Sequence, residues 1–218
     1  MRSLPEAVPG FRRDSGSMSS CGVNLYWLPL GAGGHSVRFN GRVYEALVAA
    51  AERRKRCDLY HSGLEVVTPG GRHVIEMTPV VGGGRRDHGV VAGGAVGSPL
   101  LGWTDLFRYE VRCWRDGEIP DVDEAVESPR CLSDDAAVAE RILKLAPLVP
   151  TPTWGRDELR TGDMWNSNSL VSWLLVTAGL GLEGASLPAG GRAPGWLAGI
   201  AVATRAARQE RVAGIEPA

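Results

Sequence analysis

Three residues of the types that catalyse acyl transfer stand in patterns that could bring them together: Ser167, His61 and Glu76. Ser167 directly precedes an apolar helical pattern, and a nucleophile at a helix N-terminus gains from unpaired N–H groups that can hold a developing oxyanion. A histidine on a neighbouring strand can take the serine proton, and a carboxylate can orient that histidine. These residue types predict hydrolysis or acyl transfer at an amide or ester carbonyl, with Ser167 as nucleophile, His61 as base and Glu76 as the orienting group.

A β-hairpin over residues 59–80 is predicted to carry two of the three. Two β-rich runs flank residues 68–71, Thr-Pro-Gly-Gly, in which Pro pre-sets φ and Gly supplies a positive φ. With Val67 opposite Arg72, strand alternation defines a mostly apolar core face and a second face. The core face holds Tyr60, Ser62, Leu64, Val66, His73, Ile75 and Met77. The second face holds His61, Gly63, Glu65, Val67, Arg72, Val74, Glu76 and Thr78.

This register makes Glu76 a diagonal neighbour of His61, so we expect Glu76, rather than Glu65, to hydrogen bond the His61 ring. A three-residue loop would shift the register by one residue and remove this expected contact between Glu76 and His61.

Residues 164–175, Met-Trp-Asn-Ser-Asn-Ser-Leu-Val-Ser-Trp-Leu-Leu, predict a helix that begins at polar capping residues and ends at Gly179. Ser167 lies three, four and seven residues before Leu170, Val171 and Leu174, and therefore on the buried face of the first turn. We expect the Ser167 hydroxyl within about 5 Å of a His61 ring nitrogen. The alternative is that Ser167 is only a helix-capping serine and that His61 is a structural strand histidine.

The sequence of residues 61–66, His-Ser-Gly-Leu-Glu-Val, followed by a glycine turn and Val74-Ile75-Glu76, resembles the histidine hairpin of NlpC-type papain-fold cysteine peptidases. In that family the histidine is the base and a polar residue on the returning strand orients it, which the resemblance assigns to His61 and Glu76. The Asn-Ser-Asn-Ser-Leu sequence at 166–170 is similar to the Asn-Cys-x-x-Phe helix start of the circularly permuted branch, which includes lecithin:retinol acyltransferase-like proteins. The family's cysteine is replaced by Ser167, a weaker nucleophile, so a serine enzyme and a catalytically inactive binding scaffold are the two alternatives.

The fold predicted is a single α+β domain over residues 20–205, with an antiparallel sheet packed against the Ser167 helix in a permuted papain-like arrangement. Residues 1–19 are expected to be a disordered extension and residues 206–218 a polar tail. Strands are expected at 23–28, 106–114 and 196–203, and helices at 40–50 and after Ser133. A glycine-rich surface loop is expected at 82–99.

Composition excludes several other classes of function. The formal net charge of −1 gives no general attraction to nucleic acid or to an anionic membrane, and no run is long and apolar enough to span a bilayer. The partner expected from the predicted roles of Ser167, His61 and Glu76 is a peptide, amide or ester substrate. The glycine-rich stretch at 31–35 lacks the pattern of a nucleotide-binding loop.

Cysteine and histidine spacing predicts neither a metal site nor a cofactor. Cys57, His61 and His73 fit no common zinc pattern, and His61 and His73 fall on opposite strand faces. Cys57 follows a helix C-terminus, where the dipole raises the pKa of a thiol, which disfavours it as the nucleophile. The four scattered cysteines are expected to be free thiols in a reducing cytoplasm.

Overall fold

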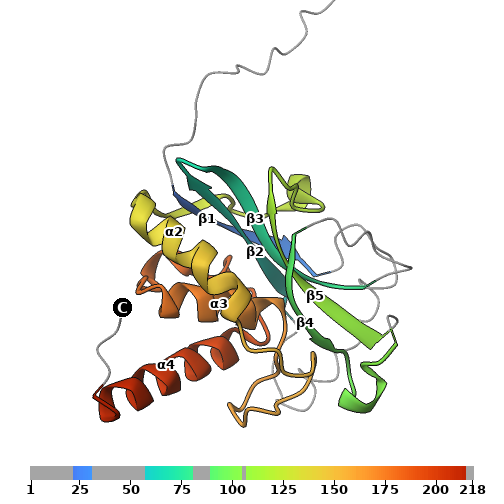
Figure 1. Ribbon diagram of the computed structural model, residues 1–218. Coiled ribbons are helices and arrows are strands. Elements are labelled where there is room, and N and C mark those ends of the chain that lie inside the picture. Colours follow the sequence, from blue (N-terminus) through green and yellow to red (C-terminus); the bar gives the residue numbers. More distant parts are fainter. Residues whose placement is uncertain (1–21, 31–56, 81–88, 105–106, 215–218) are drawn as a thin grey trace, which may run out of the picture.

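A computed structural model describes residues 22–30, 57–80, 89–104 and 107–214. In these parts of the chain a six-stranded antiparallel sheet, in the order β4-β5-β3-β2-β1-β6, packs by one face against helices (Figure 1). The strands are β1 (Val23–Pro29), β2 (Tyr60–Thr68), β3 (Gly71–Pro79), β4 (Val90–Ala95), β5 (Arg108–Arg115) and β6 (Arg130–Ser133). The α-helices are α2 (Ala136–Leu145), α3 (Ser167–Thr177) and α4 (Trp196–Val212), with short 3-10 turns η1 (Pro99–Leu101), η3 (Val122–Glu124), η4 (Ala146–Leu148) and η5 (Glu183–Ala185). The predicted α+β class is confirmed.

The β2–β3 hairpin has the predicted register. Val67 lies opposite Arg72, and Thr68 pairs with Gly71 across a loop formed by Pro69 and Gly70. Gly71 has a φ of 126°, a conformation that a β-carbon disfavours, which explains why glycine ends the turn. The hairpin therefore sorts its side chains between the two faces of the sheet as alternation requires.

The two sheet faces carry hydrophobic clusters of very different size. The face toward the helices contributes Leu25 and Trp27 of β1, together with Leu64 and Ile75 of the hairpin, to the main core. The opposite face carries a small second cluster: Tyr26, Leu28, Val74 and Ile119. Because β1 and β2 pair without a break in register, each residue's parity along the strand decides which cluster it joins.

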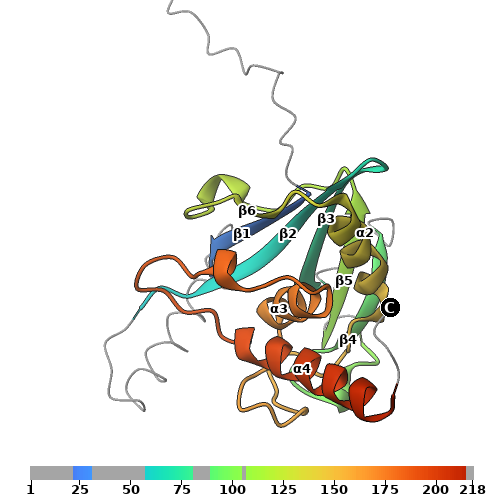
Figure 2. The ribbon, with the colours of Figure 1, turned by 90° about the vertical axis from the view of Figure 1, so that its left-hand side faces the viewer.

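Helix α3 is the central helix and is buried along most of its length, between the sheet on one side and α4 on the other (Figure 2). Close approach of α3 and α4 depends on small residues. A β-carbon at Gly199 of α4 would overlap the backbone carbonyl oxygen of Ser169. The hydroxyl of Ser172 donates to the Trp196 carbonyl at 2.8 Å, and that of Ser169 donates to the Gly195 carbonyl at 2.8 Å. Two serines on α3 therefore satisfy carbonyls at the start of α4.

Several predicted elements need correction. The strand expected at 196–203 is the first part of α4, because its small residues pack against α3 at helical spacing: Ala198, Gly199 and Ala203 are buried. The helix continues to Val212, past the domain boundary predicted at 205. The loop expected at 82–99 contains strand β4.

Other predicted elements are as expected or lie outside the described residues. Helix α2 begins after Asp135, whose carboxylate accepts from the Ala137 amide at 2.8 Å. The helix expected at 40–50 and the extension expected at 1–19 lie outside the described residues. Cys131 is disulfide-bonded, so the expectation of four free thiols is wrong, whereas Cys57 and Cys113 form no disulfide.

In the described parts of the chain, no helix is both long enough and apolar enough to cross a membrane.

We predict that Gly199→Ala destabilises the protein by about 1–3 kcal/mol, because the added methyl overpacks the α3–α4 contact even though alanine favours the helix. Gly70→Ala is the matched control, since its methyl would meet only the Thr68 hydroxyl at 3.4 Å. Urea unfolding of both variants measures the difference. An unfolding free energy for Gly199→Ala equal to that of the wild type would contradict the close approach.

Candidate functional site

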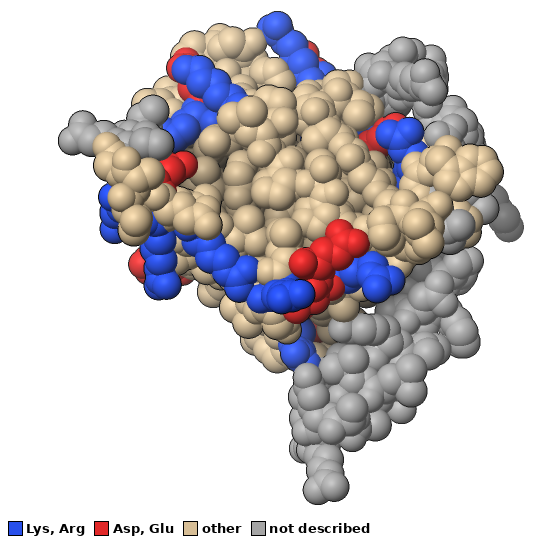
Figure 3. Space-filling view, turned by 60° about the horizontal axis from the view of Figure 1, so that its bottom comes forward, with Lys and Arg blue, Asp and Glu red and all other residues tan. Residues whose placement is uncertain are grey.

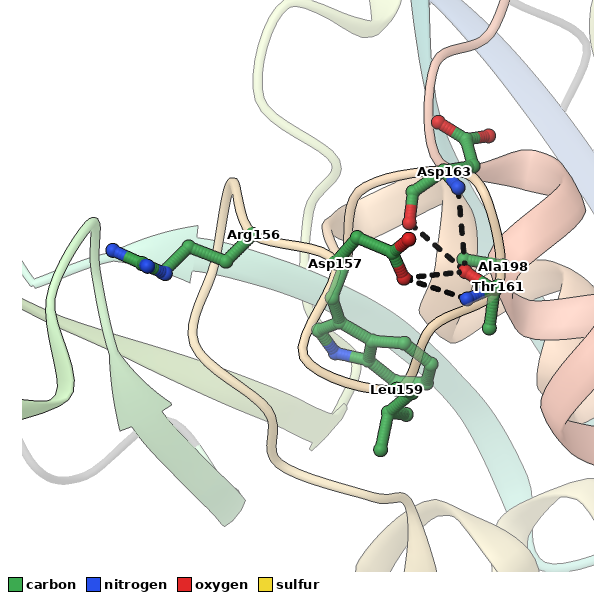
Figure 4. A pocket seen from close by; sticks show the side chains of 7 residues that line it. Arg156, Asp157, Leu159, Thr161, Asp163 and Ala198 are labelled. Carbon is green, nitrogen blue, oxygen red and sulfur yellow. Dashed lines mark hydrogen bonds between the residues drawn. The ribbon is translucent and has the colours of Figure 1, made fainter.

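The loop before α3, residues 155–165, is ordered by acceptors that bind its own backbone (Figure 4). One oxygen of Asp157 accepts from the Thr161 amide at 2.7 Å, and the other accepts from the Gly162 amide at 2.9 Å. These donors, the Thr161 amide first, lower the pKa of the Asp157 carboxyl because they favour its charged form. The surrounding side chains leave no space even for a water molecule. The bonds to Asp157 thus order the loop that leads into α3.

Asp163 connects this loop to the start of α4. One of its oxygens accepts from the Met164 amide at 2.9 Å, and the other accepts from the Gly195 amide at 2.8 Å. Gly195 has a φ of 89°, and a β-carbon there would overlap the Asn166 side chain. The N-termini of α3 and α4 are thus held side by side.

Asn166 caps α3 in a reciprocal arrangement. Its side-chain oxygen accepts from the amides of Asn168, at 2.9 Å, and Ser169, at 3.4 Å, while the Ser169 hydroxyl accepts from the Asn166 amide at 3.0 Å. This is a capping box, and it satisfies amides that a helix N-terminus otherwise leaves unpaired. The helix start predicted from Asn-Ser-Asn-Ser is confirmed.

Asn168 joins the helix to the sheet and to the loop before α4. Its amide nitrogen donates to the carbonyls of Tyr60, at 2.9 Å, and Pro194, at 2.8 Å. Its amide oxygen accepts from the Ser62 hydroxyl at 2.9 Å. Asn168 and Ser62 are both 2% exposed, so these bonds form away from water. They fix the first turn of α3 over the start of β2.

Ser167 is the one residue of the Asn-Ser-Asn-Ser sequence that these contacts leave out. It is 5% exposed, and no hydrogen bond joins its hydroxyl or its amide to any described residue. Both groups lie at the positive end of an 11-residue helix. Ser167 therefore presents two unused donors at a point where the helix favours negative charge.

His61 lies on the opposite side of the sheet from Ser167, which corrects the predicted catalytic pair. Ser62 faces α3, as its bond to Asn168 shows, so its neighbour His61 must face away. Gly63, two residues further along the strand, confirms that direction, because a β-carbon there would point at Ile119 of the second cluster, 3.8 Å away. Burial lowers the pKa of His61 to about 4, and the charge of Asp121 opposes that shift. The Ser167 hydroxyl and the His61 ring are thus separated by the sheet, and the expected approach to about 5 Å is wrong.

Glu76 shares the outer sheet face with His61 but has a different partner. Its carboxylate forms an ion pair with Arg112 of β5, at 3.6 Å, and one of its oxygens is buried without a hydrogen bond. Burial raises the pKa of Glu76, and Arg112 partly offsets the rise. No bond joins Glu76 to His61 in the described parts of the chain, so the predicted contact is absent there. Glu65 accepts from Asn24 at 3.1 Å and pairs with Arg72.

The polar residues that the catalytic prediction overlooked are Asn168 and Ser62. Their signal was present in the sequence: Ser62 is a polar residue on an otherwise apolar strand face, and Asn168 is an amide in the first turn of an apolar helix. A buried polar group needs a partner, and each supplies the other's. Among the described residues no group of three or more His, Cys, Asp or Glu side chains could hold a metal ion.

Comparisons with protein-family models, with curated proteins and with solved structures give no match to this chain.

We predict that Asn168→Ala destabilises the protein by about 2–4 kcal/mol, because it leaves the Ser62 hydroxyl and the Tyr60 carbonyl buried without these partners. It also removes one of the two side-chain amides that donate to the Pro194 carbonyl. Ser62→Ala leaves only the Asn168 side-chain oxygen without its donor and should cost about 1–2 kcal/mol. Thermal or urea unfolding of the two variants gives the comparison. Equal losses would show that the contacts to the Tyr60 and Pro194 carbonyls contribute little.

The His61 pKa predicts a loss of stability in acid. The folded protein keeps His61 neutral down to about pH 4, whereas the unfolded chain takes up the proton near pH 6.5. Stability due to this group is therefore complete above pH 6.5 and falls as the pH drops toward 4, by up to about 3 kcal/mol. Urea unfolding of the wild type and of His61→Gln between pH 7.5 and 4.5 measures it. Identical pH slopes for the two proteins would show that His61 is not desolvated.

Proposed function

We propose that the chain is a binding protein that does not convert its ligand chemically. It would hold a carbonyl or carboxylate oxygen of a peptide, amide or ester ligand at the N-terminus of α3. The observation that carries the proposal is the position of His61, on the face of the sheet away from Ser167. Ser167 keeps two donors suited to an oxygen atom, but it lacks the base that would convert its hydroxyl into a nucleophile. Donors without a base favour binding over catalysis.

The scaffold proposed is a permuted papain-like arrangement. The order of elements supports it, because the hairpin precedes α3 in the sequence and α3 packs on the apolar face of the antiparallel sheet. The scaffold departs from the family's arrangement at His61, which faces away from α3. The family assignment itself rests on the resemblance of residues 61–76 and 166–170. Because Ser167 is only 5% exposed, the ligand group that reaches it must be small at the point of contact. A single carbonyl or carboxylate oxygen meets that requirement.

The second candidate is the hydrolase or acyltransferase activity that the three residue types suggest. One observation favours it: the Ser167 amide and hydroxyl are both unpaired among the described residues, as an oxyanion site and a nucleophile require. That activity needs a general base other than His61.

Because Cys131 is disulfide-bonded, an oxidising compartment suits the chain better than the predicted reducing cytoplasm.

Replacing Ser167 by cysteine separates the two candidates. The helix N-terminus lowers the pKa of the introduced thiol. The rate at which Ser167→Cys reacts with iodoacetamide should therefore rise with pH around a pKa below the ordinary value near 8.5. If the proposal is right, adding His61→Ala changes that rate by less than about twofold, because the sheet separates the two side chains. A tenfold fall on adding His61→Ala would restore the catalytic pair and overturn the proposal.

Ligand binding is tested by amide NMR with acetate and with N-acetylglycinamide as probes. The Ser167 amide should shift on addition of either probe, because it is the unpaired donor. The Ser169 amide is the internal control, since it is already bound to the Asn166 side chain. Absence of a shift of the Ser167 amide would contradict the binding role. The binding role would also be contradicted if the wild type released p-nitrophenol from p-nitrophenyl acetate and Ser167→Ala abolished that release.

A further inference from the structure

The connection between β4 and β5 exposes two large apolar side chains in one short turn. Leu100 and Trp103 are each 82% exposed. Leu148 and Leu197 are also exposed, but they lie in two different elements, η4 and α4. Single exposed apolar side chains are ordinary for a protein surface. A tryptophan this exposed beside a leucine indicates a binding surface, because burial of both side chains against a partner would remove a large apolar area from water.

The backbone of the turn places the two side chains together. Leu100 lies in the 3-10 turn η1, and residues three apart on such a turn are eclipsed. Gly102, at its C-terminal end, keeps a helical φ of −65° and ψ of −3°, which extends the same geometry to Trp103. Leu100 and Trp103 therefore project from the same side of the turn.

The opposite side of the turn is packed against the sheet. A β-carbon at Gly102 would lie 2.8 Å from that of Ala95 at the end of β4, so the turn rests closely on the strand. The Val96 amide donates to the Phe107 carbonyl at 2.8 Å, and the Phe107 amide donates to the Thr104 carbonyl at 3.1 Å. The two apolar side chains are thus held outward on a supported turn. Phe107, at the base, is itself 37% exposed.

Positive charge flanks the turn. Arg108 pairs with Ala95 in the β4–β5 ladder and is exposed, and the exposed Arg156 donates to the Gly97 carbonyl at 3.2 Å. The acid next to Arg156, Asp157, is bound to amides of its own loop. Figure 3 shows a broad uncharged face bordered by charged side chains of both signs, with Lys and Arg beside Asp and Glu. Apolar tips beside arginines match the two layers of an anionic lipid surface.

We propose that Leu100 and Trp103 insert into the interfacial layer of a lipid bilayer, with Arg108 and Arg156 against anionic headgroups. Tryptophan favours the boundary between headgroups and acyl chains, where its ring is apolar and its N–H finds a polar partner. A lipid surface accepts two projecting side chains without a complementary groove, whereas a stable protein interface buries about 800 Å² per partner. The two side chains would hold the protein at the surface of the bilayer.

Vesicle co-sedimentation of the full chain tests this proposal. The chain should bind vesicles of phosphatidylcholine with about a third phosphatidylserine, more tightly at 50 mM than at 500 mM salt, because salt screens the arginine–headgroup attraction. Trp103→Ala and Leu100→Ala should each weaken binding by about tenfold. Leu197→Ala is the size-matched control on α4 and should bind as the wild type does. Both side chains are exposed, so the variants should keep the wild-type melting temperature.

The charge contribution has its own variants. Arg108→Glu and Arg156→Glu should weaken binding to the anionic vesicles and leave binding to pure phosphatidylcholine unchanged. The proposal is overturned if the wild type binds neither vesicle, or if Trp103→Ala binds as the wild type does. It is also overturned if sedimentation equilibrium shows that the chain self-associates through Trp103, since a second copy would then be the partner.

Discussion

The buried amide of Asn168 is the contact on which the arrangement of sheet, helix and loop depends. Asn168 lies two residues after the helix cap. Its side chain connects three segments that are far apart in the sequence: the start of β2, the first turn of α3 and the loop before α4. A buried amide that loses one of these partners is costly, so the three segments keep their relative positions. The same contact fixes which side of β2 faces the helix. It thereby decides where every neighbouring side chain on that strand points.

That choice of face is also what removes the predicted triad. Strand side chains alternate, so a strand that turns Ser62 toward α3 must turn His61 away from it. The consequence for chemistry is large, because a serine hydroxyl without a base is a weak nucleophile, whereas the same hydroxyl is an ordinary hydrogen-bond donor. Ser167, unpaired at the helix N-terminus, therefore suits recognition of an oxygen atom better than attack on a carbonyl carbon.

The sequence carried more of this result than the catalytic prediction used. The hairpin register followed from the Pro-Gly turn and was correct, and it already assigned Ser62 to the apolar face and His61 to the other. A helix that buries Ser167 packs on the apolar face, so the two predictions together excluded the Ser167–His61 pair. The capping of α3 was likewise readable from Asn-Ser-Asn-Ser. The hydrophobic pattern of the sequence did not predict α4, because its small residues pack through close approach to α3. It also did not predict β4, because the glycines of that strand hide the alternation of apolar and polar side chains.

The two serine hydroxyls that donate from α3 to carbonyls of the α4 N-terminus have a consequence for the dynamics of the molecule. Because Ser169 and Ser172 bind Gly195 and Trp196, and Gly199 admits no gap between the helices, α3 and α4 should open and close as one cooperative unit. Their amides would then share a single protection factor in hydrogen exchange. A ligand held at Ser167 would slow exchange along α4 as well, which makes the second helix a remote reporter of occupancy at the first.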